Sequence, residues 1–219
     1  MCYTYRYKGD AKVLEERYQA KVDDDFEASL YEEIHRFEQP PMPIITNVER
    51  DRIQIYTWGL IGNWIKDVDT AKKQALNCTH ARIEDLAIRA SYKDIYKTQK
   101  CVVLATAFID FKHLDSKGKK KEKYELCIDD EEFAFGGLYN IWTDPISQHQ
   151  FKTFTVVTTE ANGIMSEINN GNRMPIMLKT TQVDLWLNAT DDLVVFTEIT
   201  HAQNIEAKLL DKFSQTTLF

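Results

Sequence analysis

Residues 101–139 read CVVLATAFIDFKHLDSKGKKKEKYELCIDDEEFAFGGLY and hold the pattern that decides the fold. The apolar runs at 101–111, 123–128 and 133–139 are rich in the β-branched and aromatic residues that favour strands. Charged or glycine-containing segments separate these runs, as turns do in an antiparallel meander. The stretch therefore predicts neighbouring strands of one sheet.

The rest of the chain adds further strands and flanking helices. Residues 52–58 (RIQIYTW) alternate polar and apolar side chains, and residues 151–159 form another apolar run, so both segments are predicted strands. Segments predicted to be helical lie at 11–38, 160–169, 183–187 and 205–213, and segments that fit either helix or loop lie at 67–76 and 81–98. We expect an α+β fold, a single domain over residues 1–219, with a mixed, barrel-like β-sheet core flanked by helices.

Charge and motif content exclude several classes of protein. The chain has 219 residues and a formal net charge of −7, which argues against non-specific coating of duplex DNA or of an anionic membrane. A local basic groove remains compatible with that charge, because charges act over only about 8–10 Å at physiological salt. The densest basic run, KGKKKEK at 117–123, is predicted to be a solvated hairpin tip. Neither GxGxxG nor a P-loop is present, so no nucleotide cofactor is expected.

The termini and apolar runs predict a cytoplasmic protein that does not enter a membrane. No apolar run approaches the ~20 residues that a membrane-spanning helix needs. The first residues, MCYTYRYKGD, lack the apolar segment of a signal peptide.

Cys2 is the residue with the most distinctive potential chemistry. Removal of Met1 would leave Cys2 with both a free α-amine and a thiol, whose ordinary pKa values are about 8 and 8.5. The amine of such an aminothiol forms an imine with an aldehyde, and the neighbouring thiolate then closes a five-membered thiazolidine ring. The remaining cysteines form no CxxC pair and predict no zinc site, and Cys101 and Cys127 lie in apolar runs typical of buried thiols.

A series of short motifs follows Cys2 along the chain. They read PMPIITN at 41–47, WGLIGNWIKD at 58–67, HARIEDL at 80–86, KCVVLATAFIDF at 100–111, FAFGGLYNIW at 133–142, FTVVTTEAN at 154–162 and NRMPIML at 172–178. In this order, with Cys2 in front, the set resembles the SRAP family (SOS response-associated peptidase). The resemblance extends from Cys2 to about Leu178, and the ordered set is more specific than any single motif.

This resemblance implies a fold and a reaction. SRAP proteins form one α+β domain around a barrel-like sheet and bind single-stranded DNA in a positively charged groove. Their N-terminal cysteine attacks the ring-opened aldehyde of an abasic site and forms a thiazolidine crosslink. For this chain the resemblance implies peptidase activity limited to the Met1–Cys2 bond, no metal and no organic cofactor. We expect a monomer, associated with the nucleoid.

The family places an asparagine, a glutamate and a histidine around its cysteine, and this chain differs at all three positions. The motifs put His80 at the asparagine position, Asp110 at the glutamate position and Asn169 at the histidine position. Asp110 is one methylene shorter than glutamate, and Asn169 cannot exchange a proton near neutral pH. In one hypothesis His80, with an ordinary pKa of about 6.5, transfers protons while Asn169 holds the substrate by hydrogen bonds. In the other, catalysis is retuned or lost.

Several residues match the family's DNA-binding positions. Arg82 and Arg173 match arginines that bind phosphates near the lesion, since the guanidinium fork suits phosphate, although either arginine could instead form a structural salt bridge. Trp58 and Trp64 match tryptophans that stack on or wedge DNA bases, although Trp58 could instead pack in the core. The segments that line the family's groove contain Pro43 and Thr159.

Three functions follow from these residues. The first is a sensor of abasic sites that crosslinks to single-stranded DNA through Cys2. The second is a divergent SRAP protein that binds DNA without forming the crosslink. The third is a cysteine peptidase that acts on other substrates, which requires a depressed pKa for the Cys2 thiol.

Overall fold

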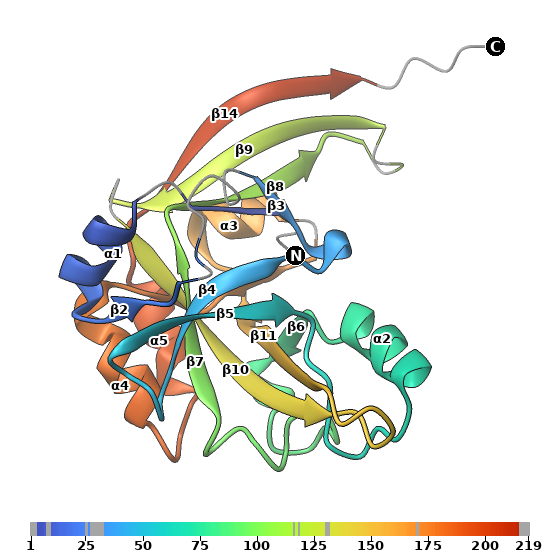
Figure 1. The fold of residues 1–219 in the computed structure, drawn as a ribbon. Helices are drawn as coiled ribbons and strands as arrows, with labels where there is room; N and C mark the ends of the chain where they lie inside the picture. The colour runs from blue at the N-terminus through green and yellow to red at the C-terminus, as the bar shows by residue number, and fades with distance from the viewer. Residues whose placement is uncertain are drawn as a thin grey trace.

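The core of the protein is a closed barrel, seen in a computed structural model that describes residues 4–7, 10–24, 26, 33–115, 117, 119–129, 132–169 and 171–214. In order around the barrel, the strands are β5 (Arg52–Trp58), β4 (Pro41–Thr46), β7 (Lys100–Ala105), β10 (Phe133–Thr143) and β11 (Gln150–Glu160). Neighbours are antiparallel except for β11 and β5, which pair in parallel and close the ring. The predicted α+β fold with a mixed, barrel-like sheet is confirmed (Figure 1).

Short strands extend this barrel sheet. β2 (Lys21–Val22) pairs in parallel with β5, and β6 (His80–Arg82) pairs in parallel with β11. Two further strands, β12 (Arg173–Pro175) and β13 (Met177–Leu178), run antiparallel to β11 and β10 respectively. Because β6 and β12 both pair with β11, the segments that carry His80 and Arg173 lie on the same part of the barrel.

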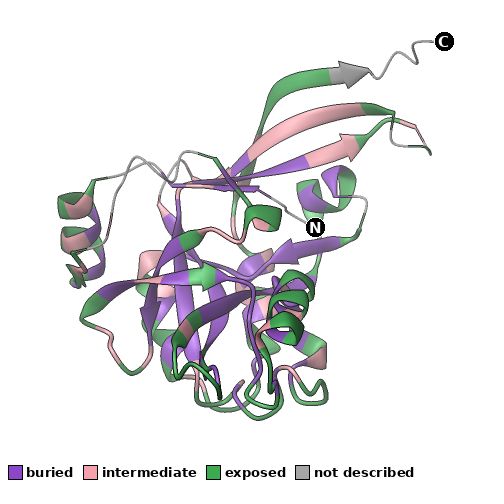
Figure 2. Cartoon of the chain, turned by 45° about the vertical axis from the view of Figure 1, so that its right-hand side comes forward, coloured by how far each residue is buried: buried purple, intermediate pink, exposed green. Residues whose placement is uncertain are grey.

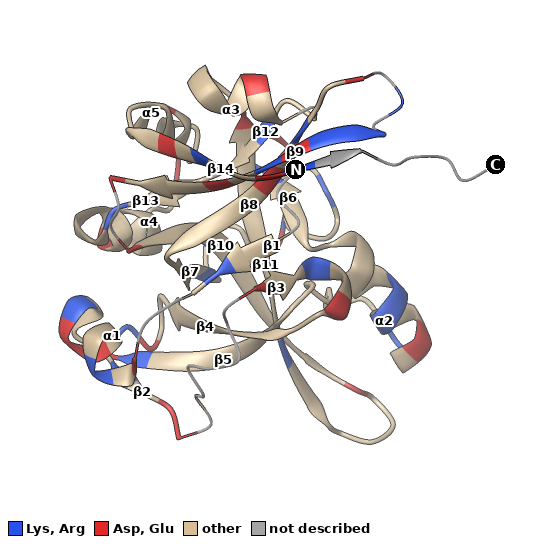
Figure 3. Cartoon of the chain, turned by 90° about the horizontal axis from the view of Figure 1, so that it is seen from above, with Lys and Arg blue, Asp and Glu red and all other residues tan. Residues whose placement is uncertain are grey.

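A second sheet has the strand order β14-β9-β8-β1-β3. Its strands are β1 (Thr4–Arg6), β3 (Ile34–His35), β8 (Ala107–His113), β9 (Lys120–Ile128) and β14 (Ile205–Ser214). Strands β8, β9 and β14 project together past the barrel, and we call them the arm (Figure 1). The prediction of a solvated hairpin tip at 117–123 fits only the start of this basic run. Lys117 and Lys119 lie in the β8–β9 turn, where the Asp115 carboxylate accepts hydrogen bonds from their backbone N at 3.1 and 2.9 Å, whereas Lys120 begins strand β9. Figure 3 shows Lys and Arg along β9.

Short helices surround the barrel. The α-helices are α1 (Ala11–Tyr18), α2 (Val68–Asn77), α3 (Gly163–Ile168), α4 (Val183–Asn188) and α5 (Val195–His201), and the 3-10 helices are η2 (Arg36–Glu38), η3 (Ile83–Asp85) and η4 (Thr180–Gln182). Asp10 and Asp67 cap α1 and α2, since their carboxylates accept from the backbone N of Val13 and Thr70 at 2.9 and 2.8 Å. No helix among the described residues is long and apolar enough to cross a membrane.

Aromatic rings from both sheets fill the core. Tyr5 of β1 stacks on Trp58 of β5 with ring centroids 4.5 Å apart, and it also contacts Phe135 of β10 at 4.3 Å. All three side chains are fully buried, and Figure 2 shows buried residues along much of the barrel strands. The N-terminal strand is therefore fixed to the barrel by a large buried aromatic side chain.

Two helix predictions are wrong. Within the described part of the segment 11–38, the α-helix extends only over Ala11–Tyr18, because Gln19 adopts a left-handed conformation (φ 51°) that ends the helix. Its later residues form β2, β3 and η2 where they are described. The segment 205–213 is strand β14, in which Ile205 and Ala207 face Ile128 and Leu126 of β9. Pairing with an available strand overrides local helix propensity there.

Candidate functional site

Asp110 and Asn169 are in contact although they lie 59 positions apart in the sequence. Asp110 is on β8 and only 6% exposed, and Asn169 is the C-terminal cap of α3 and 2% exposed. The Asn169 Nδ2 donates a hydrogen bond to Asp110 Oδ2, while Asn169 Oδ1 accepts from the backbone N of Gly171 at 2.8 Å. Because the Gly171 contact requires an acceptor, the amide is oriented with its donor group toward the carboxylate.

The other oxygen of Asp110 is also held. Asp110 Oδ1 accepts a hydrogen bond from the backbone N of Phe111 at 2.8 Å. The carboxylate is therefore fixed by its own strand and by the end of α3. Strand β8 also pairs with β1, with Thr4 opposite Ile109. Cys2 itself lies outside the described residues, two positions before Thr4 in the sequence.

His80 is held on the barrel by contacts to both ring nitrogens. Its Nε2 lies 3.2 Å from the hydroxyl of Tyr5, and its Nδ1 lies 3.2 Å from Oγ1 of Thr79. The ring also meets the Trp58 ring edge to face, with centroids 5.5 Å apart. Because each hydroxyl both donates and accepts, this arrangement accommodates either tautomer of the imidazole. Tyr5 joins His80 to β1, a contact that the sequence motifs do not reveal.

Arg173 is nearly buried and forms an ion pair with the exposed side chain of Glu84. Its Nη1 and Nη2 donate to the two carboxylate oxygens of Glu84 at 2.6 and 3.0 Å, and Nη2 also donates to the backbone oxygen of Thr158 at 2.7 Å. Partial burial raises the pKa of Glu84, but the hydrogen bond and charge of Arg173 bring that pKa below its ordinary value. The structural salt bridge, one of the alternatives for this arginine, is thus present.

Arg82 occupies a different environment from Arg173. It is exposed and lies opposite Thr158 in the β6–β11 pairing. Arg82 lines a pocket of about 440 Å³ together with His80, and a second pocket of about 580 Å³ together with Arg173 and Thr159. The structure therefore brings these four predicted residues onto one face, with Arg82 at the boundary of the two pockets.

The two tryptophans differ sharply. Trp58 has no exposed surface, and its Nε1 donates to the backbone oxygen of Thr79 at 2.8 Å. The stacking role predicted for Trp58 does not fit this position, whereas core packing does. Trp64 is 45% exposed, and its ring folds back over Gly62, where a Cβ would lie only 1.9 Å from the ring. Any side chain at position 62 would therefore clash with the ring in this position.

Pro43 and Thr159 are both buried. Pro43 lies within β4 opposite Ile55 of β5. The hydroxyl of Thr159 is 2.8 Å from that of Thr197. The DNA contact predicted for Pro43 does not fit its burial within the barrel. Thr159 lines the pocket of about 580 Å³ but is only 2% exposed, so its contact with DNA stays a prediction.

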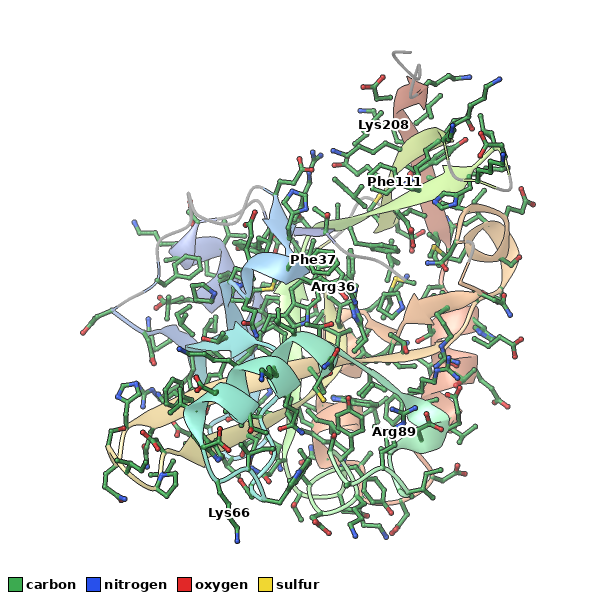
Figure 4. The ribbon with its side chains drawn as sticks, turned by 90° about the vertical axis from the view of Figure 1, so that its right-hand side faces the viewer. Arg36, Phe37, Lys66, Arg89, Phe111 and Lys208 are labelled. Atoms are coloured by element: carbon green, nitrogen blue, oxygen red, sulfur yellow. The ribbon has the colours of Figure 1, made fainter. Side chains whose placement is uncertain are left out.

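Arg36 and Phe37 are near this face, and the sequence analysis did not select them. Figure 4 shows both between the arm, which carries Phe111 and Lys208, and helix α2. Phe37 lies within the segment 11–38 that was predicted to be helical. The prolines at positions 40 and 41 were a signal that the segment leaves helical structure just after it.

Among the described residues, no group of three or more His, Cys, Asp and Glu side chains is arranged to hold a metal ion.

Comparisons with known proteins agree with the sequence motifs. A family model described as "SOS response associated peptidase (SRAP)" matches residues 1–212. The abasic site processing protein YoqW of Bacillus subtilis is 32% identical over 147 residues, 67% of this chain and 62% of YoqW. The abasic site processing protein HMCES of Gallus gallus is 27% identical over 149 residues, 60% of this chain and 44% of HMCES. The matches thus span less than two thirds of the length of these relatives.

Solved structures share the fold. A crystal structure of a Bacteroides thetaiotaomicron protein superposes with a TM-score of 0.84 at 23% identity, covering 96% of this chain and 92% of that one. A phage-related protein from Bordetella bronchiseptica gives a TM-score of 0.65 at 19% identity, covering 95% and 94%. At these identities the likeness establishes the fold alone.

Proposed function

The chain belongs to the SRAP family, and from that premise we propose that it recognises abasic sites in single-stranded DNA and attaches to them covalently through Cys2. The abasic-site processing named for YoqW and HMCES supports this proposal. The observation that carries it is that β1, which begins two residues after Cys2, pairs with the strand that holds Asp110. The proposal requires removal of Met1 by hydrolysis of the Met1–Cys2 bond.

The proposed reaction has two steps. The α-amine of Cys2 attacks the C1′ aldehyde of the ring-opened abasic sugar, and loss of one water gives an imine. The Cys2 thiolate then adds to the imine carbon while the nitrogen takes up a proton, which closes the thiazolidine ring. No oxidant, metal or organic cofactor is needed. Both steps move protons, so an acid–base group near Cys2 would accelerate them.

Asp110 and His80 are the groups proposed to move these protons. The Asp110 carboxylate is fixed by Asn169 and by the backbone N of Phe111, so it has a defined direction. His80 is held through Tyr5, the neighbour of Thr4 on β1. Asn169 is assigned the positioning role, since its amide contacts the carboxylate and has no titratable proton near neutral pH. The exposed Arg82 is proposed to bind a phosphate beside the lesion.

A second candidate function is binding of abasic DNA without the crosslink. It is favoured by the burial of the Asp110 carboxylate, which is only 6% exposed, together with an amide in contact with it. In that case the same face recognises DNA, but the carboxylate serves to hold α3 against β8.

Mixing the purified protein with a single-stranded oligonucleotide that carries one abasic site separates the two functions. Mass spectrometry first establishes whether the chain begins at Cys2. We expect a heat-stable, slowly migrating band on a denaturing gel, absent with Cys2→Ala and retained with the matched control Cys127→Ala, since Cys127 is a half-buried thiol on the arm. Asp110→Asn should slow band formation by about 100-fold or more.

The opposite result is equally clear. A protein that begins at Cys2, binds the abasic oligonucleotide and gives no band would contradict the covalent proposal and support the second function.

A further inference from the structure

Phe37 displays an aromatic ring to solvent beside the proposed site. It is 66% exposed, and of the Phe and Trp side chains whose burial is described, only Phe37 and Trp64 are exposed. A single exposed aromatic residue is common on protein surfaces and proves nothing alone. Phe37 differs from an ordinary exposed aromatic residue in the contacts that hold its ring and in its position beside the proposed site.

The ring is held by a cation and by the backbone that follows it. The Arg36 guanidinium carbon lies 4.4 Å from the centroid of the Phe37 ring, within the range of a cation–π interaction. Both residues belong to the 3-10 helix η2, which ends at Gln39 with its backbone N donating to the Arg36 oxygen at 3.2 Å. Pro40 and Pro41 follow, and their rings restrict the backbone. The exposed ring is thus presented from a restrained turn.

The same arginine connects Phe37 to the proposed site. Arg36 Nη1 donates to Thr79 Oγ1 at 3.4 Å, and that oxygen lies 3.2 Å from His80 Nδ1. Figure 4 shows Arg36 and Phe37 next to each other near the centre of the view, with Arg89 and Lys66 further out. One guanidinium therefore contacts both the exposed ring and the residue next to His80.

We propose that Phe37 is a stacking platform for the base that neighbours the abasic nucleotide; the inference rests on the proposed function. An abasic nucleotide leaves its neighbour without a stacking partner on one side. An exposed ring on the protein supplies that partner and tolerates any base, because every base has a π-face. Arg36 orients the ring and adds positive charge near the backbone phosphates. Phe37 thus selects DNA that carries a base next to the lesion.

The test measures equilibrium binding to a single-stranded oligonucleotide with a tetrahydrofuran abasic analogue, which has no aldehyde and cannot crosslink. We expect Phe37→Ala to weaken binding by about 5- to 100-fold and Phe37→Leu to weaken it similarly, because leucine is apolar but not aromatic. Phe37→Trp should bind as well as wild type. Ile146→Ala, which removes an 86% exposed apolar side chain from the β10–β11 turn, is the matched control and should change nothing.

A second oligonucleotide isolates the contact with the base. In it, both nucleotides that flank the lesion are also tetrahydrofuran, so no neighbouring base remains to stack. Wild type and Phe37→Ala should bind it with the same affinity. Equal losses on both oligonucleotides, or no loss on either, would overturn the inference while leaving the crosslinking proposal standing. Failure of wild type to bind any abasic DNA would overturn both.

Discussion

Lys100 is a lysine with no exposed surface. Its Nζ donates to the backbone oxygens of Ala189 and Lys97, the latter at 3.1 Å. Burial lowers the pKa of Lys100 to about 8, and the charge of Asp191 opposes that shift only in part. The folded state therefore releases this proton about two pH units before the unfolded chain does, given an ordinary lysine pKa of about 10.4.

This shift predicts that Lys100 makes the protein more stable as pH rises above 8. The unfolded state binds more protons between the two pKa values of this lysine, so Lys100 should add about 1 kcal/mol to the free energy of unfolding from pH 7.5 to pH 9. The buried Cys101 thiol acts in the opposite direction, because burial raises its pKa and stability declines as the unfolded thiol ionises at about pH 8.5. Denaturant unfolding of wild type and Lys100→Met at the two pH values therefore isolates the lysine. The same pH dependence in both proteins would contradict the assignment. Above about pH 10 stability declines further, because burial raises the pKa of Tyr7 and Tyr18 and the unfolded tyrosines ionise.

The two arginines of the candidate site should respond differently to removal. Arg82→Ala should weaken binding to single-stranded DNA and reduce the slope of log affinity against log salt by about 0.7, the value for one phosphate contact. Arg173→Ala should instead lower the free energy of unfolding by about 1–2 kcal/mol, because it breaks hydrogen bonds to Glu84 and Thr158. Salt titrations and denaturant unfolding of both variants test this. If only Arg173→Ala changed the slope of log affinity against log salt, the roles assigned to the two arginines would be reversed.

At the scale of elements, β14 completes the arm. It pairs with β9 from Ile205 opposite Ile128 to Ser214 opposite Lys120, with one irregularity between Leu209 and Asp211. Without it, β9 would pair only with β8, and its other edge would be unpaired. Strand β14 therefore covers backbone hydrogen-bonding groups that would otherwise face solvent.

Ending the chain after Asn204 tests this role. The backbone amides of β9 that point toward β14 should lose protection from hydrogen exchange, while those of β10 in the closed barrel should retain it. Exchange measured by NMR or mass spectrometry on both chains gives the comparison. Unchanged protection across β9 would mean that the arm is stable without its edge strand.

At the scale of the whole molecule, the sequence predicted the strands of the barrel better than the elements around it. Alternation and apolar runs identified β5, β10 and β11, because strands buried on a barrel carry a strong two-residue or continuous apolar pattern. The same reasoning failed for β14, whose exposed residues carry no such constraint and whose partner is distant in sequence. Closure by β5 and β11 depends on contacts across about 100 residues, which local patterns do not encode.

The candidate site was predictable in part for similar reasons. Ordered motifs selected Asp110 and Asn169, which the fold brings into contact, and their catalytic roles stay a prediction. The motifs gave Trp58 and Trp64 equal standing, although one is buried and the other 45% exposed. Exposure depends on what packs against a side chain from elsewhere in the chain. Pro40 and Pro41 signalled the end of helical structure near Phe37, but the contact of Arg36 with Thr79, which places the turn beside His80, is between residues 43 positions apart in the sequence.

The contacts of Tyr5 with Trp58 and Phe135 fix the position of strand β1 on the barrel, so the Tyr5 ring is a fixed point from which the length of the preceding chain can be measured. The Tyr5 ring has one position only, because Tyr5 pairs with Phe108 in the sheet and a shift in register would break the aromatic contacts. Inserting one residue before Thr4 would lengthen the chain between Cys2 and Tyr5 by at most about 3.6 Å. Near-attack geometry tolerates only errors in position far smaller than this. For the proposed reaction at Cys2, the length of the first few residues should therefore matter as well as the identity of the cysteine.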